Sequence, residues 1–204
     1  IRHEGLDKKN KQHRLPPFPF KIGLISADNS RAKNDFCHQL LTLGFFGEIL
    51  FAPASMQGEH IFQEVQQAFE KLIAEQCDII VLTRGGGSLA DLRWFDTYEL
   101  ARIIAQCPIP VISAIGHHDD VSIAEEVSHQ RFKTPTAAAD FLLAIFQQTK
   151  DSIQKITFEL SQILQNKQQV WSEQQQQLSL NLNHKATSII TFKQHKLVKK
   201  KLKI

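Results

Sequence analysis

Four short apolar runs alternate with helical patterns between residues 21 and 115. The runs are typical of strands and lie at Lys21–Ser26, Gly47–Pro53, 78–83 and Val111–Ile115. Apolar residues at helical spacing fill the intervals, at 31–43, 59–76 and about 96–106. This alternation predicts an α/β fold, an open and mostly parallel sheet with helices on both faces. In such a sheet, ligands bind beyond the carboxyl ends of the strands.

The third run ends abruptly in Arg84-Gly85-Gly86-Gly87-Ser88. Glycine has no Cβ, so the backbone N–H groups of such a turn can converge on an anion. The planar guanidinium of the arginine adds donors that fit phosphate. The run is neither a P-loop nor a GxGxxG motif. It predicts a phosphate site, and the alternative is a plain turn with the arginine in solvent.

Chemically useful residues also follow two other predicted strands. Asp35 comes shortly after the first strand, and the run Gly116-His117-His118-Asp119-Asp120 directly follows the fourth. Because parallel strands end at one edge of a sheet, we expect these residues to meet Arg84 there. That convergence is the main argument from the residues for an active site.

Each of these residues also has a structural interpretation. His117 suits a hydrogen-bonded loop histidine, and Asp35 suits an exposed position of its helix. Asp119 and Asp120 suit caps of a helix that begins near Val121. Only their joint occurrence at strand ends favours a site.

The stretch from residue 136 to residue 204 contains neither proline nor glycine. Thr134 is placed to cap a helix with Pro135 in its first position. An apolar seam with alternating steps of three and four residues then runs from Leu142 to Val170. The seam predicts a long helix or helical hairpin in a coiled coil, which needs a partner to bury it. Beyond Gln174 the alternative is a partly disordered polar tail.

The two ends of the chain differ from its middle in composition. Residues 1–20 are polar, basic and stiffened by three prolines, which indicates a linker from a missing N-terminal domain. Residue 1 is not methionine, so we expect a fragment of a longer protein. We divide the remainder into an α/β catalytic domain at 21–140 and a coiled-coil region at 141–204. Residues 193–204 hold six lysines and no acid, which leaves about −3 on the rest of the chain.

The bulk composition excludes some classes of protein. The sequence has no long apolar run and no signal-peptide pattern, so we expect no membrane association. Cys37, Cys77 and Cys107 are odd in number and lack the spacing of metal ligands. They are typical of reduced, buried thiols in a cytoplasmic protein.

Several blocks of the sequence together resemble one family, the large subunit of exodeoxyribonuclease VII. The run from Arg84 to Leu89, with Asp91, Leu92 and Phe95, resembles its RGGGSxxDLxxF block. Val111 to His117 with Asp120, and Thr134 to Ala139, resemble its P-V-[VI]-S-A-[VI]-G-H-E-x-D and T-P-[ST]-A-A-A blocks. The segments Glu4–Leu6 and Leu15–Pro19 are similar to its linker. The resemblance covers roughly residues 4–145, and the helical remainder is similar in architecture only.

This resemblance implies an exonuclease that degrades single-stranded DNA from either end to oligonucleotides and then 5′-phosphomononucleotides. It also implies small subunits bound along the coiled coil. The family's catalytic set falls on Asp35, Arg84, His117 and Asp120. The phosphate-binding positions fall on Gly85, Gly86, Gly87, Ser88 and Thr134, the last a helix cap first and a phosphate ligand second.

The sequence departs from the family pattern at the histidine block. His118 stands where the family has glutamate, and Ala90 and Arg93 replace a glutamate and a tryptophan. The block after the first strand is also looser, so Asp35 is the weakest match. The change at His118 favours an alternative, a non-catalytic phosphate- or nucleic-acid-binding module with an assembly arm.

The expected chemistry assigns a role to each residue of the set. Arg84 and the glycine N–H groups would stabilise charge on the phosphate, and His117 would act as general base or acid. Asp120 would orient the imidazole or hold a divalent ion, and Asp35 would complete either arrangement. Two carboxylates alone make a thin Mg²⁺ site, so metal dependence stays open.

Overall fold

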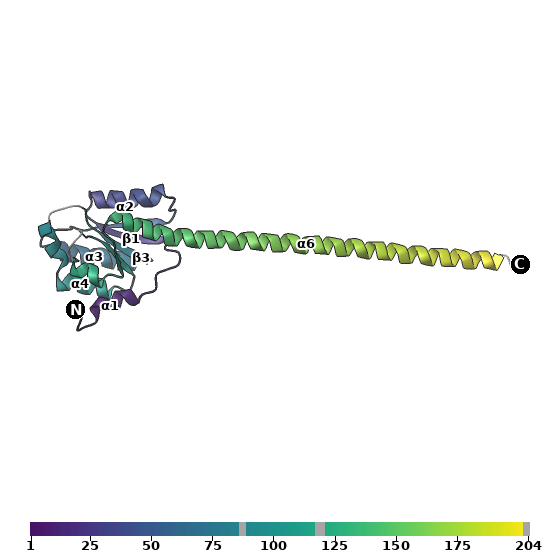
Figure 1. Ribbon diagram of the computed structural model, residues 1–204, viewed down its shortest axis with the longest axis horizontal. Helices are drawn as coiled ribbons and strands as arrows, with labels where there is room; N and C mark the ends of the chain where they lie inside the picture. The colour runs from purple at the N-terminus through teal and green to yellow at the C-terminus, as the bar shows by residue number, and fades with distance from the viewer. Residues whose placement is uncertain (86–88, 117–120, 202–204) are drawn as a thin grey trace. The chain divides into compact units, whose positions relative to one another are not determined.

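The predicted strands pair in one parallel sheet (Figure 1). The computed structural model describes residues 1–85, 89–116 and 121–201. Within these residues the sheet has five strands in the order β2-β1-β3-β4-β5. They are β1 (Lys21–Ser26), β2 (Glu48–Pro53), β3 (Ile79–Thr83), β4 (Val111–Ala114) and β5 (Gln130–Arg131). The α/β prediction is confirmed, and the short β5 is a strand that the apolar runs did not indicate.

Helices follow the strands as the spacing predicted. The α-helices of the described residues are α1 (Leu6–Lys9), α2 (Arg31–Thr42), α3 (Ile61–Ala74), α4 (Tyr98–Gln106), α5 (Ile123–Val127) and α6 (Pro135–Lys201). Two 3₁₀ segments are η1 (Asn10–Gln12) and η2 (Leu89–Phe95). Helices α2, α3 and α4 match the predicted helices to within two residues at each end.

The sheet is covered on both faces, and each face has its own apolar core. Side chains of α2 and of the first turns of α6, such as Phe36 and Phe146, pack with Val81 on one face. Side chains of α3 and α4, such as Phe69, pack with Leu82 on the other. Figure 1 shows these two layers of helices on either side of the strands. Because successive strand residues point to opposite faces, the apolar residues of β3 serve both cores.

Residues 1–20, interpreted above as a linker, contain a segment that packs into the core of the α/β fold. Leu6 is buried in the core that contains α3 and α4. Asn10 is fully buried, and its Nδ2 donates to the carbonyl oxygens of Cys107 and Ile109 at 3.2 and 3.0 Å. Its Oδ1 accepts from the backbone N–H of Val111 at 2.8 Å. One amide side chain thus ties η1 to the segment that enters β4.

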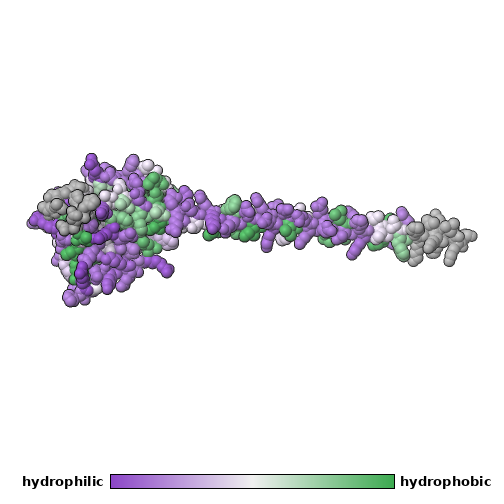
Figure 2. All heavy atoms as spheres, viewed as in Figure 1, coloured by the Kyte–Doolittle hydropathy of each residue, from purple (hydrophilic) through white to green (hydrophobic). Residues whose placement is uncertain are grey.

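The chain divides into two compact units, Ile1–Lys150 and Asp151–Ile204, and the first turns of α6 belong to the first unit. The described part of the second unit is helix without a break to Lys201, so the helical hairpin that the seam also allowed is not formed. Its side chains are exposed throughout 151–194, and they include large apolar ones such as Ile156, Leu160 and Ile163. Figure 2 shows such apolar side chains at the surface of this helix.

Candidate active site

The carboxyl ends of β1, β3 and β4 lie side by side at one edge of the sheet. Ile25 pairs with Leu82, and Thr83 pairs with Ala114, all in parallel register. The backbone N–H of Arg84 extends this ladder by donating to the Ala114 carbonyl at 3.2 Å. The chain that leaves β3 at Arg84 therefore runs beside the chain that leaves β4 toward residue 116.

Arg84 is buried although it is a charged residue. Only 7% of its surface is exposed. Leu82 belongs to the core shared with α3 and α4, so strand alternation directs Arg84, two residues later, to the same side of the sheet. Arginine is almost never fully buried unless its charge is paired, and Arg84 does interact with other groups in the structure. The solvent-exposed arginine of the alternative interpretation is therefore wrong.

The amino end of α2 meets the turn after β3. A Cβ built on Gly85 would lie 3.8 Å from the backbone nitrogen of Ala32, in the first turn of α2. Ser30 caps the helix by accepting from the N–H of Lys33 at 3.1 Å, and the Ser26 and Ser30 hydroxyl oxygens lie 2.7 Å apart. The first-turn N–H groups and the helix dipole favour an anion at this point. The serines are functional candidates that the motif search missed, although a serine before a helical pattern is a cap signal.

Helix α6 begins at the same edge of the sheet. Thr134 follows β5, which is parallel to β4, and its Oγ1 accepts from the N–H of Ala137 at 3.1 Å. The predicted cap is confirmed, with Pro135 as the first helical residue. The Thr134 hydroxyl is exposed and lies 2.9 Å from that of Thr136. The phosphate-binding role given to Thr134 stays a prediction.

Asp35 occupies an exposed position in the second turn of α2. It lies roughly 6 Å along the helix axis from the amino end, at 1.5 Å per residue. The other members of the predicted site, namely Gly86, Gly87, Ser88, His117 and Asp120, lie outside the described residues. The described part of the chain contains no cluster of three or more His, Cys, Asp or Glu side chains that could hold a metal ion.

A buried carboxylate that the sequence analysis did not single out lies against Gly116. Glu125 is 5% exposed, and its Oε2 accepts from both the backbone N–H and the hydroxyl of Ser122 at 3.0 Å. A Cβ on Gly116 would meet Glu125 Oε1 at 2.5 Å. The carboxylate thus fixes the last described residue before His117. The pattern Ser-x-x-Glu is a capping-box signal, so Ser122 rather than Asp119 or Asp120 caps α5.

Two buried hydroxyl groups lie at the same end of the sheet. Thr83 Oγ1 and Ser113 Oγ have no hydrogen-bond partner among the described residues. Thr83 follows Leu82, the partner of Ile25, so it lies beside Ser26 at the carboxyl edge. Buried hydroxyl groups in proteins are usually paired, so polar groups at this edge remain to be satisfied.

Comparison with known proteins gives a consistent result. A family model described as "Exonuclease VII, large subunit" matches residues 6–203. The exodeoxyribonuclease 7 large subunit of Desulfitobacterium hafniense is 37% identical over 171 residues, which are 81% of this chain and 42% of that protein. Those of Alcanivorax borkumensis and Haemophilus influenzae are 36% and 33% identical, over 70% and 89% of this chain. The chain spans 32% and 42% of the length of these two relatives.

Among the helices of the described residues, none is both long and apolar enough to cross a membrane.

Proposed function

The chain belongs to the exonuclease VII large-subunit family, and we propose that it forms part of an exodeoxyribonuclease. The proposed reaction is hydrolysis of phosphodiester bonds in single-stranded DNA, from both ends, to oligonucleotides and 5′-phosphomononucleotides. The observation that carries this proposal is the buried Arg84 at the carboxyl edge of the sheet, followed directly by Gly85 at the amino end of α2. A buried guanidinium and a helix amino end at the same edge of a sheet suit the phosphate of a nucleic acid.

Arg84 and the amino end of α2 are proposed to bind the scissile phosphate. In the reaction, a water oxygen attacks phosphorus, the bond from phosphorus to the 3′-oxygen breaks, and the products are a 5′-phosphate and a 3′-hydroxyl. Negative charge increases on the phosphoryl oxygens in the transition state. A guanidinium and backbone N–H groups already in place stabilise that charge without reorganising. The turn from Gly85 to Ser88 and the hydroxyl of Thr134 are assigned to the same phosphate.

His117 and Asp120 are proposed for proton transfer. His117 removes a proton from the attacking water or donates one to the leaving 3′-oxygen, because histidine changes charge near neutral pH. Asp120 orients the imidazole or binds a divalent ion, and Asp35 completes either arrangement. Mg²⁺, where bound, would neutralise phosphate charge and activate water. Loss of activity in EDTA, with recovery on added Mg²⁺, would show that the reaction depends on a divalent ion.

Replacement of Arg84 tests the proposal directly. In the complete large subunit assembled with small subunits, Arg84→Ala is expected to lower the release of acid-soluble nucleotides by roughly 10²- to 10³-fold. Arg93→Ala is the matched control, because Arg93 is an exposed arginine in the same region of the chain. Unchanged release by Arg84→Ala would show that the site is misassigned. A thermal unfolding scan of each variant separates loss of chemistry from loss of fold.

The alternative function is a non-catalytic module that binds phosphate or nucleic acid. The observation that favours it is His118, which stands where the family pattern has glutamate. On this alternative the complete assembly binds single-stranded DNA without releasing nucleotides. His118→Glu would then restore release, whereas an enzyme active with His118 releases nucleotides before any change.

The second unit is proposed to bind the small subunits as a coiled coil, in a cytoplasmic complex. The exposed apolar side chains of its helix, such as Leu160 and Ile163, support this. Leu160→Asp with Ile163→Asp is expected to abolish co-purification of small subunits. Gln165→Asp, on the same helix, is the control for added charge. Retention of small subunits by the double variant would contradict the proposal.

A further inference from the structure

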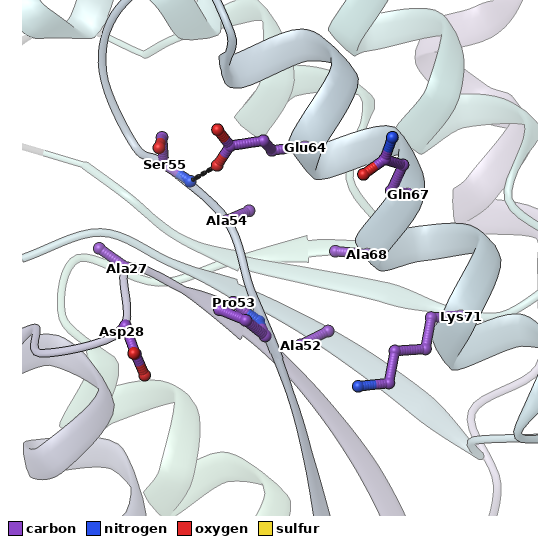
Figure 3. Close-up of a pocket in the computed structure, with 10 residues that line it drawn as sticks. All are labelled: Ala27, Asp28, Ala52, Pro53, Ala54, Ser55, Glu64, Gln67, Ala68 and Lys71. Atoms are coloured by element: carbon purple, nitrogen blue, oxygen red, sulfur yellow. Dashed lines mark hydrogen bonds between the residues drawn. The ribbon is translucent and has the colours of Figure 1, made fainter.

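A cleft of about 490 Å³ opens beyond the carboxyl ends of β1 and β2, alongside α3 (Figure 3). It lies on the same side of the sheet as Arg84, because Ala27 and the α3 residues pack against the core that contains Leu82. β1 is hydrogen-bonded to β3, so the end of β1 at Ala27 is the immediate neighbour of Arg84. The volume falls within the range of small-molecule sites. Any ligand in it would lie next to the proposed phosphate site.

One part of the cleft wall is apolar and made of small residues. Ala52, Ala54 and Ala68 are buried, and Ala27 and Pro53 complete this part of the wall. Side chains this short leave open a space that leucine or phenylalanine would fill. A flat apolar group such as an aromatic ring could occupy that space.

The charges on the rim nearly cancel. The charged residues of the lining are Asp28, Glu64 and Lys71, and Lys33, which is not in the lining, forms an ion pair with Asp28 at 3.4 Å. Glu64 Oε2 accepts from the backbone N–H of Ser55 at 2.7 Å, and this bond lowers the pKa of the Glu64 carboxyl. A carboxylate that stays charged opposes a phosphate in the cleft. The rim therefore suits an uncharged polar group better than an anion.

Two polar side chains on α3 remain available to such a group. Lys71 and Gln67 have no hydrogen-bond or ion-pair partner among the described residues. Figure 3 shows the Lys71 side chain directed from α3 toward the ends of the strands. Together they supply donors and one acceptor, which match the edge of a nucleobase.

We propose that this cleft binds the nucleobase of the nucleotide whose phosphate lies at Arg84. The inference rests on the proposed nuclease function, because that function places the phosphate. The phosphate would lie over the edge at Arg84 and α2, and its base would enter the alanine-lined cleft below α3. The alanine-lined wall would then contact the base ring and supply the affinity, and the polar side chains of the rim would form hydrogen bonds with the edge of the base.

The test compares oligonucleotides whose end nucleotide carries either a base or an abasic tetrahydrofuran. With the complete enzyme, the end nucleotide with a base is expected to give about tenfold higher kcat/KM, in line with the contribution of one stacked base. In Ala68→Leu, which fills the cleft, this ratio falls to about one. Ala74→Leu adds the same group at an exposed position of α3 and keeps the tenfold ratio.

Gln67→Ala with Lys71→Ala is the second variant, because both side chains are exposed and their loss does not disturb the core. It is expected to lower the ratio about threefold. Where cleavage depends on Arg84, two results would overturn the nucleobase assignment. One is equal kcat/KM values for the two substrates in the wild type, and the other is an unchanged ratio of these values in Ala68→Leu. Absence of Arg84-dependent cleavage refutes the proposed function instead. In that case, the cleft assignment is tested by the affinities of dCMP and of deoxyribose 5-phosphate for the wild type and for Ala68→Leu. The assignment expects dCMP to bind about tenfold more tightly than deoxyribose 5-phosphate in the wild type and about equally in Ala68→Leu.

Discussion

Replacing Gly116 by alanine is expected to destabilise the first unit by crowding the buried carboxylate of Glu125. The new methyl group would lie 2.5 Å from Oε1, 3.3 Å from Cδ and 3.4 Å from Oε2. The first distance is shorter than any normal contact, so the carboxylate must move by more than half an ångström. Glu125 is buried and bonded to Ser122, which leaves it little freedom to do so.

The cost follows from the bonds that would be strained. Oε2 accepts two hydrogen bonds from Ser122, one from its backbone N–H and one from its hydroxyl. The bond from the N–H forms the capping box of α5 together with the bond that the Glu125 N–H donates to Ser122 Oγ at 3.3 Å. Loss of a cap costs about 0.5–2 kcal/mol, and weakened bonds to a buried charge add about 1–2 kcal/mol. We therefore expect Gly116→Ala to lower the free energy of unfolding by about 2–3 kcal/mol. For a chain of this length that corresponds to a Tm lower by about 5–10 °C.

Tryptophan fluorescence can report the unfolding of the first unit alone. The chain has two tryptophans, and Trp171 lies exposed in the second unit. Trp171→Phe leaves Trp94 of η2 as the reporter in the first unit. Urea titrations of this background with and without Gly116→Ala then give the difference in unfolding free energy.

A matched glycine and a double variant make the reasoning refutable. Gly85 follows β3 as Gly116 follows β4, but a Cβ on Gly85 would meet nothing nearer than the Ala32 nitrogen at 3.8 Å. Gly85→Ala should thus change stability by less than about 0.5 kcal/mol, while reducing activity because the methyl group enters the proposed phosphate site. In a Glu125→Ala background, Gly116→Ala should cost less than about 0.5 kcal/mol. An unchanged cost in that background would refute the role of the carboxylate.

Three further outcomes are expected from buried polar groups. Asn10→Ala removes three hydrogen bonds, two of them buried, and should lower the unfolding free energy by about 2–4 kcal/mol in a urea titration. An unchanged unfolding free energy would show that Asn10 does not anchor η1. Burial lowers the pKa of His129, so the folded protein resists protonation of this imidazole. Its contribution to stability should be complete above about pH 6.5 and should be lost as the pH falls through the lowered pKa. His129→Gln should therefore flatten a plot of Tm against pH. Burial raises the pKa of the Cys77 and Cys107 thiols to about 11. In native protein at pH 8, iodoacetamide should therefore modify the half-buried Cys37 before either of them, as measured by mass spectrometry. Equal labelling of the three cysteines would contradict the burial of Cys77 and Cys107.

Within the first unit, the strands and helices that sequence patterns predicted are those whose apolar residues pack in one of the two cores. β5 escaped prediction because Gln130 and Arg131 contribute no apolar run. The strand exists through backbone pairing with β4, in which His129 donates to Val111 at 2.8 Å and Phe132 donates to Ser113 at 2.8 Å. Such pairing depends on where β4 lies, which a local pattern does not contain.

The same distinction applies to the candidate site. The place of Arg84 followed from its position after a buried strand, because parallel strands share an edge. The approach of Gly85 to the amino end of α2, and the Ser26–Ser30 pair, depend on how β1 and β3 are ordered in the sheet. The alanines that line the cleft carry no motif at all. Their effect is the absence of bulk, which becomes visible only when three separate segments are brought together.

Helix α6 shows how one periodicity can serve two physical purposes. Leu142 and Phe146 are buried in the core of the first unit, and Ile153 and Ile156 continue the same spacing with more than half of their surface exposed. The apolar seam in the sequence therefore does not show where the first unit ends, because apolar residues have the same spacing whether the helix packs on a sheet or on another helix. Phe146 is the last residue of α6 in that core, and the first unit ends at Lys150. Exposure of a row of apolar side chains beyond that point is unfavourable in water. For this reason the second unit is the part of this chain for which a protein partner is proposed.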